Sequence, residues 1–366
     1  MKIINIVGAR PQFVKAAVIS RSIEEHNRNQ GKELIQELIV HTGQHFDQNM
    51  SNVFFDQMNI PVPNYNLEIN SLSHGAMTGK MLEKIEEVLQ NEQPDWVIVY
   101  GDTNSTLAGA LAAKKMQIKV AHIEAGLRSF NMRMPEEINR ILTDRISDIL
   151  FCPTQTAIDN LKREGFENMG IEQILCGDVM YDAVLYYQDK SKCPEGVDEK
   201  KQFILSTIHR QENTDDKAKL TSIFEALEII AQSQKVVLPL HPRTIKKLNQ
   251  FNITPNENIQ IIEPVGYFEM IWLLTNASMV ITDSGGLQKE AFFFKKPCLT
   301  VREETEWVEL VDNGFNFLVG SDKQQIVHAF NKVRTSSMDY SINLYGLGNA
   351  GDEIVKGLIE YTNRKR

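Results

Sequence analysis

Short β-rich runs alternate with longer amphipathic stretches along the chain, and this alternation constrains the fold more than any other feature. The β-rich runs of the first half are residues 3–7, 37–42, 95–102, 119–125 and 149–153. The intervening stretches, 16–27, 75–90, 105–116 and 135–146, carry apolar residues at helical spacing. Each run is therefore followed by a crossover long enough for parallel pairing with another strand. The pattern predicts a doubly wound α/β domain.

A polar stretch, 187–201, interrupts this alternation before it starts again. The β-rich runs of the second half are residues 203–209, 236–241, 259–265, 279–284 and 297–301. We therefore predict two Rossmann-like α/β domains, 1–185 and 186–350, in a chain of 366 residues. The last stretch, 351–366, begins with a helical pattern and could cross back to cover the first domain, a point that the sequence leaves open.

Charge and composition narrow the classes of ligand. The chain has 39 basic and 48 acidic residues, so its formal net charge is −9, and 42% of its residues are hydrophobic. These values are typical of a soluble globular protein and argue against binding a nucleic-acid backbone through a general basic field. An anionic ligand must then be held by a few local cations.

The cysteines and the amino terminus suggest a protein of a reducing compartment, with no zinc site and no membrane helix. Cys152, Cys176, Cys193 and Cys298 form no Cys-x-x-Cys pair, and no His lies at metal-ligand spacing from them, so we expect no zinc site. Asn5 interrupts the first apolar run and no apolar run approaches the ~18 residues of a membrane helix. We expect a cytoplasmic protein with free thiols.

The first β-rich run ends in a motif that favours anion binding, Gly8-Ala9-Arg10-Pro11-Gln12-Phe13-Val14-Lys15. Gly8 permits a sharp turn, and Pro11 suits the first position of a helix, whose free N–H groups attract anions. Arg10 and Lys15 place two cations there, so a diphosphate would fit. The alternative is that both are solvated surface charges.

Three acidic signals follow strands of the first domain, where open parallel sheets bind ligands. Asp102 could be a ligand group, or Asp102 and the hydroxyls that follow it could cap the next helix. Glu124 ends an apolar run and needs either a function or a partner, for which Arg128 is a candidate. Glu136 and Glu137 fall in the first turn of a helix, where one of them is expected only to stabilise the helix dipole.

The second domain carries a candidate phosphate site. His209 and His241 each end a β-rich run with an Arg close behind, which resembles a phosphate rim, although a His at such a position is often structural. Ser284, Gly285 and Gly286 join a strand to a helix and expose backbone N–H groups at the helix start. Glu290, one turn later, is placed to accept ribose hydroxyls; the alternative is a tight turn with an exposed Glu.

A formal dinucleotide fingerprint near the carboxy terminus does not support NAD binding. Gly346, Gly348 and Gly351 have the Gly-x-Gly-x-x-Gly spacing, but no strand precedes them and only 15 residues follow. That length is too short for the second strand and the acidic ribose ligand of the motif.

Eight motifs occur in a fixed order over nearly the whole chain: GARPQFVK, HTGQHFDQNM, GDTNSTLAGALAA, HIEAGLRS, PEEINR, IHRQEN, LHPRT and TDSGGLQKEA. Together they resemble the non-hydrolysing UDP-N-acetylglucosamine 2-epimerase family. The resemblance implies two Rossmann-like domains facing across a cleft, as in glycosyltransferase-B folds, with a UDP-sugar between them and no metal or cofactor. It also implies a homodimer formed largely through the amino-terminal domain, with no nucleic-acid or membrane partner.

The resemblance also implies roles for individual residues. The catalytic residues it implies are Asp102, Glu124, Glu136, Lys15 and His209. The UDP-binding residues it implies are Arg10, His209, Ser284, Gly285, Gly286 and Glu290. Arg140 and His241 match further family positions, which we assign to the substrate sugar.

The chemistry that the family is understood to perform needs this mixture of side chains. C2 of the hexose has no adjacent carbonyl, so simple deprotonation would be slow. The family instead expels UDP from C1 as the C2 proton leaves, and adds UDP back with the opposite configuration at C2. Such a route needs carboxylates near the sugar, cations near the diphosphate and a closed cleft.

Departures from the common pattern point to one branch of the family. The loop between Arg128 and Pro135 is short and carries Arg133. Five segments resemble the branch that acts on UDP-2,3-diacetamido-2,3-dideoxyglucuronate: GARPQFVK, RSFNMRMPEEINRILTD, GDVM, QKEAFFF and TEWVEL. Arg133 is our candidate partner for the uronate carboxylate, the alternative being a solvated or otherwise paired Arg. Met270 stands where an aromatic residue usually lies near the uracil, and Asp47 departs from the pattern of enzymes that UDP-N-acetylglucosamine activates.

Four alternatives remain open from the sequence. They are a UDP-N-acetylglucosamine 2-epimerase, a hydrolysing 2-epimerase that releases free sugar, a glycosyltransferase, and a non-catalytic sensor of nucleotide sugars. Fold alone does not separate the last two from an epimerase. Three carboxylates matched in the first domain favour the epimerase.

Overall fold

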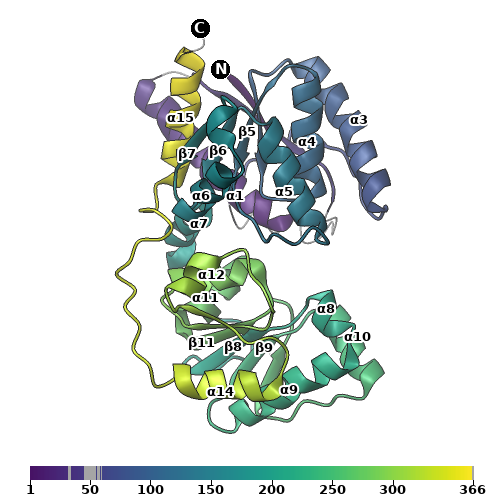
Figure 1. Cartoon of the computed structure of the whole chain (residues 1–366), viewed down its shortest axis with the longest axis vertical. Helices are drawn as coiled ribbons and strands as arrows, with labels where there is room; N and C mark the ends of the chain where they lie inside the picture. Colours follow the sequence, from purple (N-terminus) through teal and green to yellow (C-terminus); the bar gives the residue numbers. More distant parts are fainter. Residues whose placement is uncertain (32–33, 45–54, 56–57, 59, 365–366) are drawn as a thin grey trace. The chain divides into compact units, whose positions relative to one another are not determined.

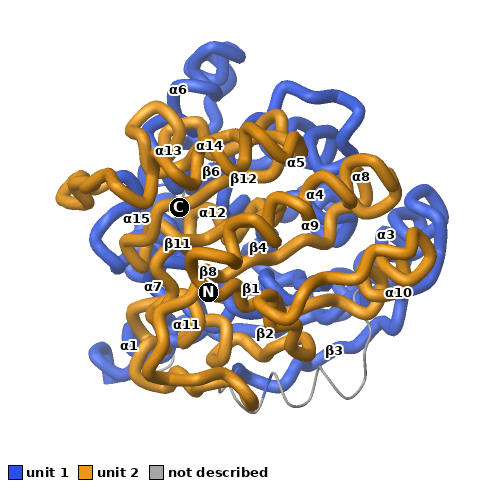
Figure 2. Tube along the Cα trace, turned by 90° about the horizontal axis from the view of Figure 1, so that it is seen from below, with its two compact units in different colours: residues 1–183, 344–366 blue, residues 184–343 orange. Residues whose placement is uncertain are grey.

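The structure is a computed structural model that describes all residues except 32–33, 45–54, 56–57, 59 and 365–366. The chain divides into two compact units, coloured separately in Figure 2. Unit 1 contains residues 1–183 and 344–366, and unit 2 contains residues 184–343. Each unit is a parallel sheet covered by helices, so the predicted α/β class with two Rossmann-like halves is confirmed.

The sheet of unit 1 is entirely parallel, in the order β3-β2-β1-β4-β5-β6-β7. Its strands are β1 (Lys2–Val7), β2 (Gln36–His41), β3 (Tyr65–Asn66), β4 (Trp96–Tyr100), β5 (Lys119–Ile123), β6 (Ile149–Cys152) and β7 (Glu172–Leu175). The sequence predicts five of these and misses the two edge strands, β3 and β7. Neither edge strand contains a fully buried residue, so neither produces a recognisable apolar run.

Helices cover both faces of this sheet (Figure 1). They are α1 (Arg10–Gln30), α3 (His74–Glu92), α4 (Asn104–Lys115), α5 (Pro135–Ile146), α6 (Gln155–Arg163), the 3-10 turn η1 (Phe166–Asn168) and α15 (Ala350–Arg364), while α7 (Val179–Tyr187) runs from unit 1 into unit 2. The carboxy-terminal α15 packs against α1, and the indole N–H of Trp96 donates to the hydroxyl of Thr362 at 2.9 Å. The last helix of the chain is thus part of unit 1.

Strand β4 shows how the core of unit 1 is divided. Val97 and Val99 join a buried cluster with residues of α3 and α4, whereas Trp96 contacts Tyr361 of α15. Because side chains alternate along a strand, a strand buried on both faces must be apolar at every position. All five residues of β4 are buried. This explains why β4 reads as a continuous apolar run.

Unit 2 repeats the architecture with the strand order β10-β9-β8-β11-β12-β13, again all parallel. Its strands are β8 (Phe203–Thr207), β9 (Val236–Pro239), β10 (Ile259–Ile262), β11 (Ala277–Thr282), β12 (Cys298–Thr300) and β13 (Asn316–Leu318). Its helices are η2 (Gln188–Lys190), α8 (Gln211–Thr214), α9 (Lys217–Ala231), α10 (Pro242–Phe251), α11 (Tyr267–Asn276), α12 (Gly285–Phe293), α13 (Val308–Asp312) and α14 (Lys323–Val333). The short edge strand β13 is the one that the sequence does not predict.

Membrane-spanning helices, disulfides and clusters of potential metal ligands are absent from the described part of the chain. Its helices do not combine the length and apolar character needed to span a bilayer. Its four cysteines are free thiols. No cluster of three or more potential metal ligands occurs among the described residues.

Candidate active site

The strand order of unit 1 reverses direction between β1 and β4, and the candidate residues gather at the carboxyl ends of these strands. Open α/β sheets bind ligands at such a switch point. Gly8 follows β1, Asp102 follows β4 by two residues, and Glu124 follows β5 directly. The pairing of β1 with β4 and of β4 with β5 brings these three loops side by side.

Lys15 of α1 forms an ion pair with Glu124, and both side chains are largely buried. Glu124 has a left-handed backbone, with φ of 68°. Gly101 makes room for the pair, because a Cβ there would lie 3.1 Å from a carboxylate oxygen of Glu124 and 3.5 Å from Nζ of Lys15. Arg128, the alternative partner for Glu124, instead pairs with Asp144 at 2.7 Å and Glu164 at 2.6 Å.

Asp102 is held by Arg140 of α5. The guanidinium donates to Asp102 at 2.5 Å, and the Arg140 side chain is 4% exposed against 33% for Asp102. Of the predicted capping groups, the hydroxyl of Thr103 and not Asp102 caps α4, accepting from the N–H of Thr106. Asn139 of α5 adds a hydrogen bond to the Asp102 carbonyl at 2.9 Å. Helix α5 therefore fixes both the backbone and the carboxylate of Asp102.

The neighbouring Glu136 and Glu137 have different surroundings. Glu137 is buried and accepts hydrogen bonds from the N–H groups of Ser129 and Phe130 and from Arg140. Burial alone would raise its pKa, but these donors outweigh burial and the pKa lies below its ordinary value. Glu137 thus secures the loop before α5, whereas the side chain of Glu136 is exposed.

Gln12 is a buried residue of the site that our sequence analysis did not single out. Its side-chain oxygen accepts from the N–H of Gly8 at 2.8 Å and of Ala9 at 3.0 Å. Its amide group donates to the Tyr100 carbonyl at 2.7 Å. One side chain thereby ties the loop after β1 to the end of β4. The sequence signal that could have identified Gln12 is its place within the GARPQFVK motif.

Arg10 and Arg133 are the other predicted residues of unit 1 that the structure describes. Arg10 is half-buried at the start of α1, and Arg133 is exposed in the loop before α5. The backbone N–H of Arg133 donates to the Asn131 side chain at 3.1 Å, which shapes the loop. Asp47 lies outside the described residues.

In unit 2, Asp283 organises the loop that carries His209. Asp283 is fully buried at the end of β11 and accepts from the N–H of His209 at 3.1 Å and of Arg210 at 3.0 Å. Nδ1 of His209 lies 3.4 Å from the same carboxylate, and the ring is 49% exposed. Strands β8 and β11 are neighbours at the switch point of this sheet. His209 is therefore held on one side and open on the other.

The Ser-Gly-Gly segment begins α12, as the sequence predicts. Ser284 is the N-cap residue, and a Cβ added at Gly286 would meet no atom within 4 Å. The space beside Gly285 holds Glu306, which pairs with Arg302 at 3.0 Å. The Arg302–Glu306 pair lies outside every motif to which we assigned a site residue, so it went unnoticed in the sequence.

Glu290 and His241 complete the predicted residues of unit 2. Glu290 is half-buried in the second turn of α12. His241 is exposed and caps α10, because its Nδ1 accepts from the N–H of Arg243 at 3.2 Å. Arg243 pairs with Asp215 at 2.7 Å. The two histidines therefore differ in structural role, since one faces a buried carboxylate and the other caps a helix.

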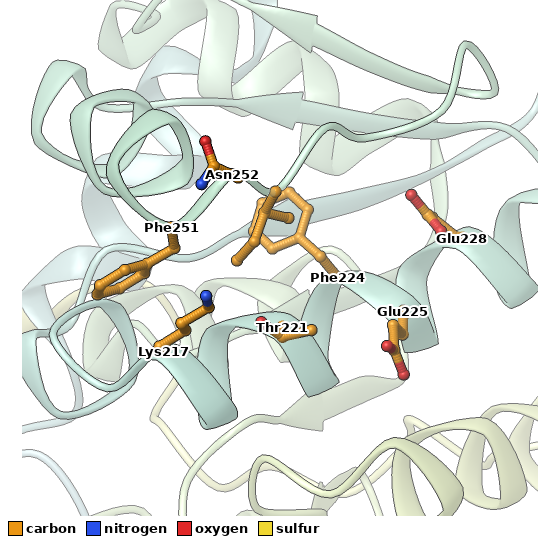
Figure 3. Close-up of a pocket in the computed structure, with 8 residues that line it drawn as sticks. Lys217, Thr221, Phe224, Glu225, Glu228, Phe251 and Asn252 are labelled. Atoms are coloured by element: carbon orange, nitrogen blue, oxygen red, sulfur yellow. The ribbon is translucent and has the colours of Figure 1, made fainter.

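A surface pocket of unit 2 contains none of the predicted site residues (Figure 3). It has a volume of about 380 Å³ and lies between α9 and the end of α10. Phe224, Phe251 and Asn252 line it together with charged residues of α9. The proposed chemistry does not use this pocket.

The sequence of this chain is similar to those of known proteins over nearly its whole length. The sequence model of the UDP-N-acetylglucosamine 2-epimerase family matches residues 27–359. A Pseudomonas aeruginosa protein named UDP-2,3-diacetamido-2,3-dideoxy-D-glucuronate 2-epimerase is 55% identical, over 98% of this chain and 99% of its own. A Methanocaldococcus jannaschii UDP-N-acetylglucosamine 2-epimerase is 44% identical over 97% of this chain and 98% of its own.

Solved structures show the same relationship. The crystal structure of Methanocaldococcus jannaschii UDP-GlcNAc 2-epimerase in complex with UDP-GlcNAc and UDP matches with a TM-score of 0.88 and 43% identity, covering 98% of this chain and all of that one. The Neisseria meningitidis enzyme bound to UDP-GlcNAc matches with a TM-score of 0.86 and 30% identity, covering 98% of this chain and 100% of that one. With its two parallel α/β units and its ordered motifs, this chain belongs to the UDP-N-acetylglucosamine 2-epimerase family.

Proposed function

We propose that this chain catalyses the reversible epimerisation at C2 of a UDP-activated 2-acetamido sugar, by elimination and re-addition of UDP. The observation that carries the proposal is the set of acidic side chains at one edge of the unit 1 sheet. Asp102 and Glu124 follow neighbouring strands, and Glu136 begins the helix that holds Asp102 through Arg140. The family membership supplies the reaction class.

The reaction begins when a carboxylate takes the proton from C2. The electrons of the C2–H bond form the C1–C2 double bond, and the C1–O bond breaks with its electron pair leaving on UDP. Re-addition reverses these steps, with the proton delivered to the opposite face of C2. Two proton-transfer groups on different sides of the sugar are needed, which suits carboxylates on separate loops. We assign proton transfer to the set Asp102, Glu124 and Glu136, without a separate role for each.

The departing diphosphate needs positive charge and N–H donors. In unit 2 we assign this role to His209, Ser284, Gly285 and Gly286, with Glu290 accepting from the ribose. In unit 1 we assign it to Arg10. A group held by a buried carboxylate, as His209 is by Asp283, is pre-organised to stabilise developing negative charge. We assign Arg140 and His241 to the substrate sugar.

We propose that the substrate is UDP-2,3-diacetamido-2,3-dideoxyglucuronate and the product its mannuronate epimer, a sugar for bacterial surface polysaccharide. The relative that shares 55% identity carries this name. The alternative, UDP-N-acetylglucosamine, is the sugar in the names of the relatives at 44% and 42% identity.

The proposal is tested by incubating the purified protein with each UDP-sugar in deuterated water. We expect inversion at C2 together with incorporation of deuterium at that carbon. No inversion and no exchange with either sugar would contradict the proposal and favour a sensor. Free sugar accumulating in step with UDP would identify a hydrolysing enzyme, and consumption only in the presence of an acceptor would identify a glycosyltransferase.

Replacing Arg133 with alanine is expected to weaken use of the uronate about tenfold while leaving UDP-N-acetylglucosamine unaffected. Arg133 is exposed in the unliganded protein, so its contact with the substrate carboxylate is partly screened and is weaker than a buried pair. The measurement is kcat/KM for both sugars in competition. Equal losses for both sugars, or a wild-type preference for UDP-N-acetylglucosamine, would contradict the assignment.

We also propose that the protein is a cytoplasmic homodimer assembled through unit 1. Sedimentation at micromolar concentration should give about twice the mass of one chain. Exposed apolar residues on and before α5, Phe130, Met132, Ile138 and Leu142, supply a surface that association would cover. A purely monomeric profile would contradict this proposal.

A further inference from the structure

A buried network of charged side chains lies behind the ends of β4 and β5, outside the proposed catalytic set. It consists of His122 on β5, Asp144 on α5, Arg128 in the loop between them and Glu164 at the end of α6. The side chains of His122, Asp144 and Arg128 are 0% exposed, and that of Glu164 is 23% exposed. A polar network this deeply buried is costly unless every member is satisfied.

Both ring nitrogens of His122 face hydrogen-bond acceptors. Nε2 lies 2.7 Å from the carbonyl oxygen of Gly101, and Nδ1 lies 2.7 Å from a carboxylate oxygen of Asp144. A carbonyl oxygen can only accept, so Nε2 carries a hydrogen. The other oxygen of Asp144 accepts from Arg128 at 2.7 Å and from the N–H of Gly126 at 3.2 Å, as a carboxylate does, so Nδ1 also carries a hydrogen.

The charges around the ring balance. His122 as an imidazolium and Arg128 contribute two positive charges, while Asp144 and Glu164 contribute two negative charges. The thiol of Cys152 on β6 stays neutral, because burial raises its pKa well above the ordinary value. With His122 as an imidazolium, the network therefore places no net charge in the core.

The network contacts the two loops that carry proposed catalytic carboxylates. The carbonyl that His122 holds belongs to Gly101, which has φ of 61° and precedes Asp102. The second oxygen of Asp144 accepts from the N–H of Gly126 at 3.2 Å. Gly126 lies two residues after Glu124, and both have positive φ. Glycine adopts such a φ readily, whereas at Glu124 the conformation persists only when the surrounding structure holds it.

We propose that His122 is a positioning residue for epimerisation: as a buried imidazolium, it fixes the Gly101 carbonyl and, through Asp144, the Gly126 amide, and so sets the places of Asp102 and Glu124. This inference rests on the proposed function for its kinetic consequence. Its structural part, a doubly protonated ring hydrogen-bonded to Gly101 and Asp144, can be tested without measuring turnover.

The protonation state is tested on the wild-type protein labelled with ¹⁵N-histidine. At about pH 8 an ordinary histidine is neutral, so two protonated ring nitrogens at His122 are the expected signature of the buried imidazolium. The signal is assigned by its loss in His122→Gln. A His122 signal with one unprotonated nitrogen would overturn the inference.

The positioning role is tested by the kinetics of His122→Gln. Glutamine can donate to Gly101 but then turns its oxygen toward Asp144, so the loops shift. We expect kcat to fall about 100-fold, with KM changed less than about threefold, because misplacement affects the reacting groups more than binding. His328→Gln, on the exposed surface of α14, is the matched control and should behave as wild type. A folded His122→Gln with a wild-type kcat would overturn the inference.

A rescuing substitution separates positioning from general damage. In His122→Gln combined with Asp144→Asn, the asparagine amide donates to the glutamine oxygen, and Arg128 and Glu164 still balance in charge. We expect the double variant to recover kcat about tenfold relative to His122→Gln. No recovery in a folded double variant would contradict the hydrogen-bond chain described above.

Two readouts do not depend on the proposed function or on the stability of His122→Gln. Asp144→Asn should remove one ring proton from His122, because asparagine can donate to Nδ1; an unchanged His122 signal would overturn the inference. The carboxyl ¹³C resonances of Asp102 and Glu124 should shift in the same variant. If the wild type epimerises no UDP-sugar, the proposed function fails, while these signals still decide whether His122 fixes the two loops.

Discussion

Replacing Glu124 with glutamine is expected to lower kcat about 10³-fold, because the amide cannot take or deliver the C2 proton. General acid–base groups contribute on the order of 10²–10⁴-fold to catalysis. Glu124 is suited to this role because it is largely buried, sits on a strand end and pairs with Lys15, so its position is fixed before substrate arrives. KM should change little, since the loss lies in the reacting step. The measurement is steady-state inversion at C2, with deuterium exchange at C2 followed in parallel.

Two controls make the Glu124→Gln result specific. Glu83→Gln changes an exposed glutamate on α3 that pairs only on the surface with Lys80, and it should retain full activity. Thermal unfolding of Glu124→Gln shows whether Lys15, left without its partner, destabilises unit 1. A folded variant that keeps more than about a tenth of the wild-type kcat would remove Glu124 from the proton-transfer set.

The places of Asp102 and Glu124 at strand ends could be predicted because they depend only on the residues next to them in the sequence. Each follows an apolar run, and the carboxyl ends of parallel strands meet at one edge of the sheet. The fold class followed from the same periodicity. The edge strands β3, β7 and β13 escaped prediction because they have two to four residues and no continuous apolar signal.

The partners of these residues could not be read from the sequence. Glu136 and Glu137 are adjacent in the same helical turn, and only tertiary packing shows that Glu137 is buried against the N–H groups of Ser129 and Phe130. Arg128 likewise has Glu124 as its nearest acidic residue on the amino-terminal side, yet it pairs with Asp144 and Glu164. Ion pairs between separate elements depend on how helices pack on the sheet, which periodicity does not encode.

Arg128 therefore offers a stability test of the packing that the sequence did not reveal. Its side chain is fully buried, with Asp144 at 2.7 Å and Glu164 at 2.6 Å. Burial opposes its charge, but the two carboxylates outweigh burial and raise the pKa of the guanidinium above its ordinary value. Arg128→Ala would leave Asp144 buried with one cation fewer, and removing one partner of a buried pair costs about 3–5 kcal/mol.

We expect Arg128→Ala to lower the free energy of unfolding of unit 1 by about that amount. Trp96 is the tryptophan of unit 1, so its fluorescence in a Trp272→Phe, Trp307→Phe background follows the urea unfolding of this unit alone. Arg163→Ala, an exposed arginine of α6, is the matched control and should change the same free energy by less than about 0.5 kcal/mol. Equal effects of the two substitutions would mean that the Arg128 pairs contribute no more to stability than a surface charge does.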